Sequence, residues 1–148
     1  MSIPELFTEI PAQIYIGGWR EGRSSRKLVD INPFDDSELA TITQASKEDV
    51  DEAYETAKQA QREWAAKTPA ERTAVLTAAG DWFVANQDKV AAVLAAESGS
   101  SALKSAVEVG IAVDSIRESA TFPSRVHGRI SPSNTPGKEN RIYREPIG

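Results

Sequence analysis

The chain has 148 residues, of which 40% are hydrophobic and 26% are charged, and its net charge is −5. These proportions are typical of a folded globular domain and argue against disorder, a membrane span or a nucleic-acid partner, since neither a long apolar run nor a basic cluster is present. Cysteine is absent, which removes disulfides and thiolate chemistry from this chain and fits a cytoplasmic location.

The N-terminal third predicts two pairs of short strands. Residues 1–12 lack hydrophobic periodicity and contain two prolines, so we expect them to be a flexible arm. Residues 13–21, QIYIGGWRE, alternate around a Gly-Gly pair, which is typical of a hairpin. Residues 27–31 and 38–43 predict a second strand pair, because the segment between them, beginning NPFDD, is rich in turn formers.

Two helices with explicit start signals follow. Ser46 with Asp49, and Thr68 with Glu71, each match a capping box, and Pro69 suits the first helical position. Their apolar stripes are Val50, Ala53, Ala57, Ala60 and Trp64 in the first helix, and Val75, Leu76, Ala79, Trp82 and Phe83 in the second. We expect these stripes to bury against each other and to form the core of the chain.

Two further helices and a strand arm complete the prediction. One helix covers residues 89–96 and ends at Gly99, and the next begins at Ser100 or Ser101 and ends before Phe122. The apolar stripe of the latter is Leu103, Val107, Ile111 and Ile116. Residues 126–130 and 140–145 predict the two strands of an arm.

The predicted fold class is therefore α+β. Amphipathic helices are combined with short antiparallel N-terminal strands and a C-terminal two-stranded arm. We divide the chain into the flexible arm of residues 1–12, the strands and helical layer of residues 13–123, and the strand arm of residues 124–148.

No motif in the chain carries chemistry by itself. His127 could be a general base, but no acid or nucleophile stands beside it at a recognisable spacing, so a histidine without a catalytic role is favoured. Arg72 and Arg117 could bind an anion, or could equally pair with carboxylates on a helix surface. Acidic residues that could suggest a cation site suit the start and solvated face of a helix better; they are Glu48, Asp49, Asp51, Glu52 and Glu55. Tryptophans that could stack on a ligand are Trp19, Trp64 and Trp82, and we favour core packing for the last two.

The order of several segments nevertheless resembles a known family. IYIGGW, DINPFDDSELATITQASKEDVDEAYETAKQA, TPAER, AAESGS and RIYREPIG together resemble the N-terminal portion of NAD(P)-dependent aldehyde dehydrogenases, over residues 13–148. The resemblance implies a parent enzyme that oxidises a small aldehyde to a carboxylic acid with NAD or NADP and forms a homo-oligomer, either a dimer or a tetramer. It also implies that the chain is truncated after residue 148, because the family's cofactor contacts, catalytic cysteine, glutamate base and oxyanion-hole asparagine lie further along. This chain alone is therefore expected to be inactive, with no catalytic or cofactor-binding residue of its own.

The resemblance carries a few positions over to this chain. It implies a monovalent cation between the backbone carbonyl of Ile31 and the side chain of Glu97, with further ligands beyond the chain. Ser100 stands where the family often has lysine, which points to the benzaldehyde and vanillin dehydrogenase branch. Ile111 or Ser115 is implied to line the substrate tunnel.

An alternative from another class stays open. The strand arm resembles the family's oligomerisation arm, so the chain could instead be a non-catalytic interaction or oligomerisation module of the same ancestry. Because the helical stripes exceed what a short helix pair covers, we also expect exposed apolar surface and self-association.

Overall fold

Two small antiparallel hairpins precede the helices in the computed structural model, which describes residue 7 and residues 12–147. The predicted flexible arm therefore lies largely outside the described residues. The hairpins consist of β1 (Ile14–Tyr15) with β2 (Trp19–Arg20), and β3 (Lys27–Ile31) with β4 (Glu38–Thr43). Both predicted strand pairs are confirmed, and the second pair has the predicted bounds.

The helices begin where the capping signals place them. Ser46 Oγ accepts from the Asp49 backbone N–H at 3.2 Å, and Asp49 Oδ2 accepts from the Ser46 N–H at 2.9 Å. Thr68 and Glu71 form the same reciprocal pair at the next start. Because each box satisfies N–H groups that have no partner within the helix, it fixes the first residue locally. The α-helices whose bounds the structure describes are α2 (Lys47–Ala66), α3 (Pro69–Ala85), α4 (Gln87–Ser98) and α5 (Ala102–Thr121).

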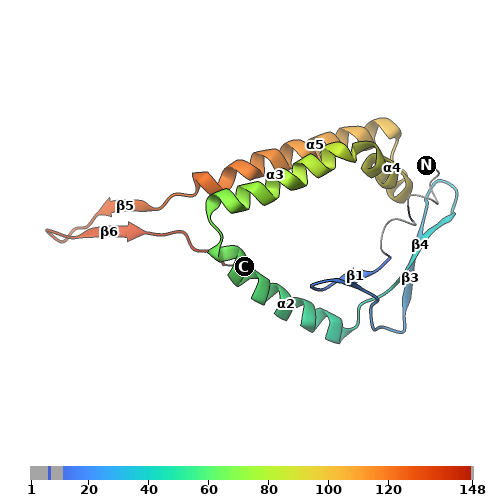
Figure 1. The fold of residues 1–148 in the computed structure, drawn as a ribbon, viewed down its shortest axis with the longest axis horizontal. Coiled ribbons are helices and arrows are strands. Elements are labelled where there is room, and N and C mark those ends of the chain that lie inside the picture. Colours follow the sequence, from blue (N-terminus) through green and yellow to red (C-terminus); the bar gives the residue numbers. More distant parts are fainter. Residues whose placement is uncertain (1–6, 8–11, 148) are drawn as a thin grey trace.

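The helical layer is built around α5, against which both α3 and α4 pack (Figure 1). On α5 the buried residues are Ser105, Val109, Val113 and Ala120. A Cβ atom on Gly80 of α3 would lie 3.4 Å from Ile116 Cγ2, so the two helices approach closely at this point. Thr73 Oγ1 donates to the Ala120 carbonyl at 2.8 Å and ties the start of α3 to the end of α5.

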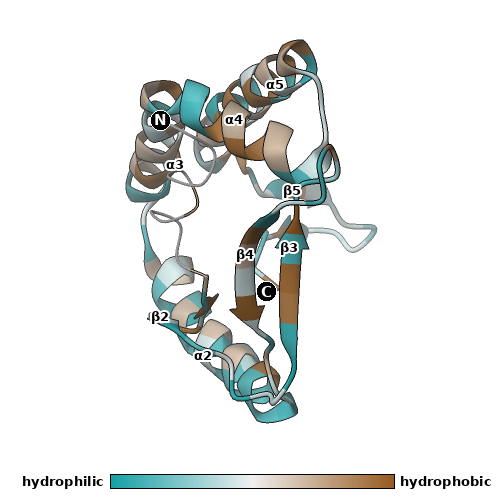
Figure 2. Ribbon diagram, turned by 90° about the vertical axis from the view of Figure 1, so that its right-hand side faces the viewer, coloured by the Kyte–Doolittle hydropathy of each residue, from teal (hydrophilic) through white to brown (hydrophobic). Residues whose placement is uncertain are grey.

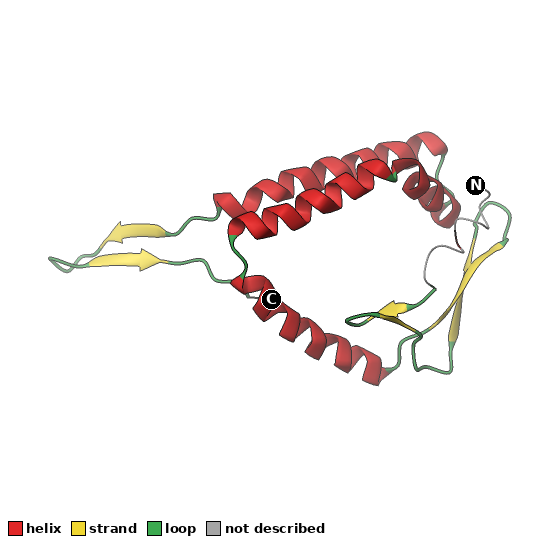
Figure 3. Ribbon diagram, viewed as in Figure 1, coloured by secondary structure: helices red, strands yellow, loops and turns green. Residues whose placement is uncertain are grey.

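The predicted burial of the first two helices against each other is wrong. From the corner at residues 67–68, α2 extends away from α3, while α3 lies along α5 (Figure 3). Trp64 is 38% exposed and Trp82 is 55% exposed, so neither is a core residue in this chain. The extended backbone of Lys67 and Thr68 sets this direction.

The predicted stripe of α5 is wrong for three of its four residues, whereas Ile116 is partly buried against α3. Leu103, Val107 and Ile111 are 77%, 53% and 60% exposed, and the buried face lies next to them on the same helix. Because α5 is apolar on two faces, only the packing of α3 and α4 decides which face is buried. The other stripe stays open to solvent in this chain.

At the end of the helical layer that α4 forms, β4 lies against this helix. The buried pair Phe7 and Ala96 is packed by partly buried residues of both elements, namely Leu39, Ala40, Ala92 and Val93. Figure 2 shows hydrophobic segments along β3, β4 and α4 on this side of the molecule. This contact places the end of the β3 strand beside the end of α4.

The chain leaves α5 through the 3₁₀ helix η1 (Phe122–Arg125) and forms a protruding arm (Figure 1). The arm consists of β5 (Arg129–Pro132) and β6 (Glu139–Ile142), paired antiparallel. The predicted strands began earlier on one side and ended later on the other, because pairing stops at Arg129 and Ile142. The α+β fold class is confirmed. No helix of the described residues is long and apolar enough to cross a membrane.

Candidate functional site

The turn that follows β3 lies against the end of α4. Asn32 is buried, and its Oδ1 accepts from the Phe34 N–H at 3.0 Å, which holds the turn closed. Gly99, directly after α4, has a φ of +64°, and a Cβ atom on it would lie 2.9 Å from Pro33 Cγ. Glycine is therefore required at this position both for its backbone conformation and for the close approach.

This contact brings two carboxyl groups together. Glu97 lies in the last turn of α4, and Asp30 is the residue before Ile31 on β3. Burial raises the pKa of Glu97, and the neighbouring Asp30 carboxyl group raises it further. Two neighbouring carboxylates repel each other when both are ionised, and the negative end of the α4 dipole makes the electrostatic potential at this point more negative. The arrangement therefore favours a cation.

The structure places the two predicted cation ligands in this one region. Ile31 follows Asp30 directly, so its carbonyl belongs to the strand end that meets Glu97. Among the described residues no group of three or more acidic, histidine or cysteine side chains could hold a metal. Backbone carbonyls would have to complete the coordination, which suits a hard cation that takes oxygen ligands. The cation site at Ile31 and Glu97 stays a prediction, and Asp30 is the residue that sequence reasoning missed.

The hollow beside Glu97 explains why its charge is desolvated. It measures about 250 Å³ and lies between α4 and α5. Most of its wall is apolar, and Glu108 is the second acidic residue in it; the aliphatic part consists of Val90, Val93, Leu94, Val109 and Ala112. An ionised carboxylate at the edge of such a wall loses part of its hydration, and the pKa rises accordingly.

The acidic start of α2 is an ion-pair network. Asp49 is fully buried and accepts from the backbone N–H groups of Arg23, at 2.8 Å, and Ser46, at 2.9 Å. These bonds, together with the Arg23 guanidinium, hold the pKa of Asp49 far below its usual range. Glu52 pairs with both Arg20 and Arg23. The placement of these acids at a helix start is confirmed, whereas the two arginine partners were not predicted.

The other candidate residues lie apart from this region. Trp19 packs edge to face on Tyr15, with ring centroids 5.2 Å apart, and is 58% exposed. Ile111 and Ser115 are both exposed and lie one turn apart on the open face of α5. This placement agrees with a role beside a further part of a larger protein, but nothing in the described chain forms a tunnel around them.

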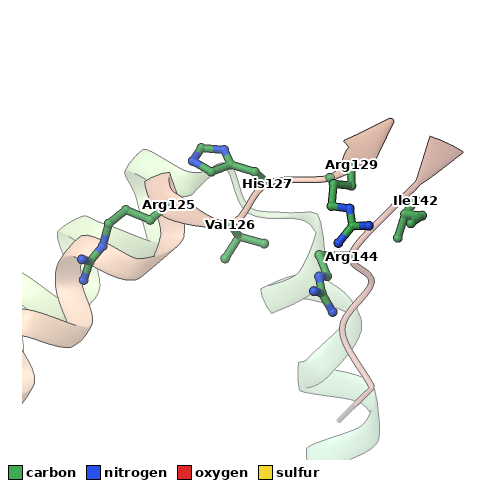
Figure 4. A pocket seen from close by; sticks show the side chains of 7 residues that line it. Arg125, Val126, His127, Arg129, Ile142 and Arg144 are labelled. Atoms are coloured by element: carbon green, nitrogen blue, oxygen red, sulfur yellow. The ribbon is translucent and has the colours of Figure 1, made fainter. Parts of the chain in front are cut away.

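A basic hollow lies where the arm joins the helical layer (Figure 4). It measures about 640 Å³, and in the part of the chain that the structure describes no acidic residue lines it. Arg129 and Arg144 lie next to each other on the two legs of the arm, whereas His127 points away from Arg144. Arg125 is already used, since it pairs with Glu118 and its guanidinium carbon lies 4.9 Å from the centroid of the Phe122 ring. His127 therefore has no acid or nucleophile beside it in this hollow.

Comparison with known proteins gives a consistent result. Residues 19–148 match the model of the aldehyde dehydrogenase family. The chain is 53% identical over 130 residues to a vanillin dehydrogenase of Corynebacterium glutamicum, which covers 87% of this chain and 27% of that protein. It is 38% identical over 142 residues to a benzaldehyde dehydrogenase of Bacillus subtilis, which covers 96% of this chain and 29% of that protein.

Solved structures agree with the sequence matches. An NAD-dependent benzaldehyde dehydrogenase from Corynebacterium glutamicum superposes with a TM-score of 0.85 at 50% identity, over 90% of this chain and 30% of that one. A betaine aldehyde dehydrogenase from Staphylococcus aureus superposes with a TM-score of 0.91 at 23% identity, over 97% of this chain and 29% of that one, and shows the likeness of fold. The chain thus spans less than a third of the length of these relatives.

Proposed function

The chain belongs to the aldehyde dehydrogenase family, and we propose that it supplies the N-terminal part of an enzyme that oxidises an aldehyde to a carboxylic acid with NAD or NADP. The observation that carries this proposal is the 53% identity to a vanillin dehydrogenase across 87% of the chain. When bound, the nicotinamide cofactor accepts the hydride that leaves the aldehyde. Without the rest of such an enzyme, and without a cysteine, this chain has no activity.

The role of this chain in the enzyme is structural. Its helical layer exposes the apolar stripe of Leu103, Val107 and Ile111, which is the type of surface that a second domain covers. With that domain in place, Ile111 and Ser115 border the substrate. The arm of residues 124–148 mediates assembly into a homo-oligomer, since its hairpin of β5 and β6 projects away from the helical layer (Figure 1).

We assign the enzyme to the aromatic-aldehyde branch. Vanillin and benzaldehyde dehydrogenases are among its relatives, and Ser100 departs from the lysine that the family often carries there. Here the Lys104 ammonium donates to Ser100 Oγ at 3.0 Å, so a positive charge reaches this position from the next turn of chain. A monovalent cation is held at Ile31 and Glu97, with Asp30 as a third source of negative charge.

A chimeric enzyme tests the proposal. Residues 19–148 replace the matching part of the Corynebacterium glutamicum vanillin dehydrogenase, and NAD and NADP reduction are followed with vanillin, benzaldehyde and acetaldehyde. We expect activity with the two aromatic aldehydes, within about tenfold of the unmodified enzyme. A chimera that folds and binds the cofactor but oxidises none of the three aldehydes would contradict the proposal.

The isolated chain supplies the matching control. Purified alone, it should reduce neither NAD nor NADP with any of these aldehydes. Measurable reduction would disprove the claim that it is inactive. A chimera that oxidises acetaldehyde faster than benzaldehyde would retain the enzyme class and refute the aromatic assignment.

A further inference from the structure

The corner between α2 and α3 contains a second hollow, distinct from the cation region. It measures about 450 Å³, which is within the range of small-molecule pockets. Five parts of the chain meet there: the end of α2, the first half of α3, the end of α5, the η1 segment and the returning leg of the arm. Its apolar wall includes Trp64, Leu76, Phe122 and Val126.

Two arginines line this apolar hollow without a counter-charge. The Nε atom of Arg72 is buried and has no hydrogen-bond partner among the described residues. Arg144 enters from the arm, and no carboxylate of the described residues lies within ion-pair distance of either guanidinium. Figure 4 shows Arg144 and Val126 extending toward the end of α2, where Trp64 lies. None of the described residues that form the wall is acidic.

A buried donor without an acceptor is costly, so it marks a position where a partner atom belongs. Arginine donates through a planar fork that matches the two oxygens of a carboxylate. The aromatic side chains of Trp64 and Phe122 in the same wall favour a ligand with an apolar body. Phosphate or sulfate would satisfy the charge but leave the apolar wall in contact with water.

We propose that this corner pocket, formed by Arg72, Arg144, Trp64 and Phe122, binds a carboxylate attached to a flat apolar body, such as an aryl carboxylate. The carboxylate accepts from Arg72 and Arg144, and the ring packs on Trp64. The proposal does not depend on the function proposed above, because every residue in it belongs to the isolated chain.

The experiment is a titration of the chain with benzoate. A W19F/W82F background keeps Trp64 as the single tryptophan, so its fluorescence reports on the pocket wall, and ¹⁵N NMR follows the Nε resonances of Arg72 and Arg144. We expect saturable fluorescence changes and shifts of both Nε resonances with benzoate. Benzamide, which has the same shape without the charge, and inorganic phosphate should each bind at least about tenfold more weakly, because each meets only half of the site.

Substitutions separate the pocket from a general basic surface. R144Q should weaken benzoate binding at least about tenfold, and because Arg144 is exposed its loss should leave the fold intact. R72Q should do the same, and R72K, which keeps the charge but not the fork, should restore only part of the binding. R62Q on the exposed face of α2 changes the net charge equally and should leave binding unchanged.

Three results would overturn the proposal. Equal affinity for benzamide would mean that the pocket recognises only the ring, and equal affinity for phosphate would mean that it is an unspecific anion surface. Binding that survives R144Q, with circular dichroism showing a folded variant, would mean that the ligand lies elsewhere.

Discussion

Replacement of Gly99 by alanine tests the close contact that places Glu97 beside β3. Gly99 has a φ of +64°, and forcing an L-residue into this left-handed region costs roughly 1–2 kcal/mol. The added Cβ would also lie 2.9 Å from Pro33 Cγ, so the rigid turn must shift. We expect Gly99→Ala to lower the free energy of unfolding by about 2 kcal/mol.

The same substitution at Gly110 is a matched control. Gly110 lies within α5, and nothing lies within 4 Å of a Cβ atom built on it. Alanine in a helix interior is favoured over glycine by about 1 kcal/mol, so Gly110→Ala should stabilise the chain. The two variants should therefore differ by roughly 3 kcal/mol.

Urea unfolding followed by circular dichroism measures this difference. At about 2–4 °C per kcal/mol for a chain of this size, thermal midpoints should separate by roughly 6–12 °C, with the parent chain between the variants. The pKa of Glu97 should also fall in Gly99→Ala, because the shift of the turn moves the adjoining end of β3, with Asp30, away from Glu97. A Gly99→Ala variant as stable as the parent would refute the role of this contact.

Three further predictions concern charge and exposed apolar surface. Because the pKa of Asp49 is lowered on folding, its stabilising effect is present above its unfolded pKa and is lost as pH falls through the folded pKa; Asp49→Asn should lower the urea midpoint at pH 7, and this difference should shrink as the pH is lowered toward 2. Because the pKa of Glu97 is raised on folding, its contribution is present below its unfolded pKa and lost as pH rises; Glu97→Gln should raise the urea midpoint at pH 7 in buffer without added alkali cation. Added sodium or potassium should then stabilise the parent more than Glu97→Gln. The exposed stripe of α5 predicts self-association, which light scattering should detect and the double substitution Leu103→Glu and Val107→Glu should reduce.

Each of these predictions has a contrary result. An Asp49→Asn variant with an unchanged pH dependence would show that the carboxylate is not the titrating group. Equal stabilisation of the parent and Glu97→Gln by alkali cations would remove Glu97 from the cation site. A strictly monomeric parent chain at high concentration, with no dye bound to apolar patches, would contradict self-association through α5.

Local signals allowed the elements themselves to be predicted. The bounds of the strands at residues 27–31 and 38–43 follow from a strand pattern interrupted by a turn-forming segment. The starts of α2 and α3 follow from capping boxes, in which every participating residue lies within four positions. Such features depend on neighbouring residues alone, so they can be inferred without knowledge of the packing.

The choice of the buried face could not be predicted in the same way. Val107 and Val109 lie two residues apart on α5, and each belongs to a possible apolar stripe. Which stripe is buried depends on where α3 and α4 approach, and this approach is set by long-range contacts such as that between Gly80 and Ile116. The spacing of its stripe likewise predicts that Trp64 is a core residue. The structure differs because α2 turns away from α3.

In the candidate cation region, too, some residues can be inferred from the sequence and others only from the packing. Glu97 and Ile31 came from the family resemblance, whereas Asp30 is brought against Glu97 only by the packing of the Pro33 turn on Gly99. The pairing of Arg23 with Asp49 also crosses from a loop to a helix and has no local signature.

The arm also determines the distance along the chain between the two arginines of the corner pocket. Arg144 reaches the corner only after the backbone has run outward along β5, reversed within residues 133–138, and returned along β6. Its position is therefore set by strand register, in which Arg129 faces Ile142. A slip of one residue would turn every side chain of β6 to the other face of the hairpin and would displace the segment after it, which carries Arg144. Insertions or deletions in the distant tip of the arm should thus change the position of Arg144 in the corner of the helical layer.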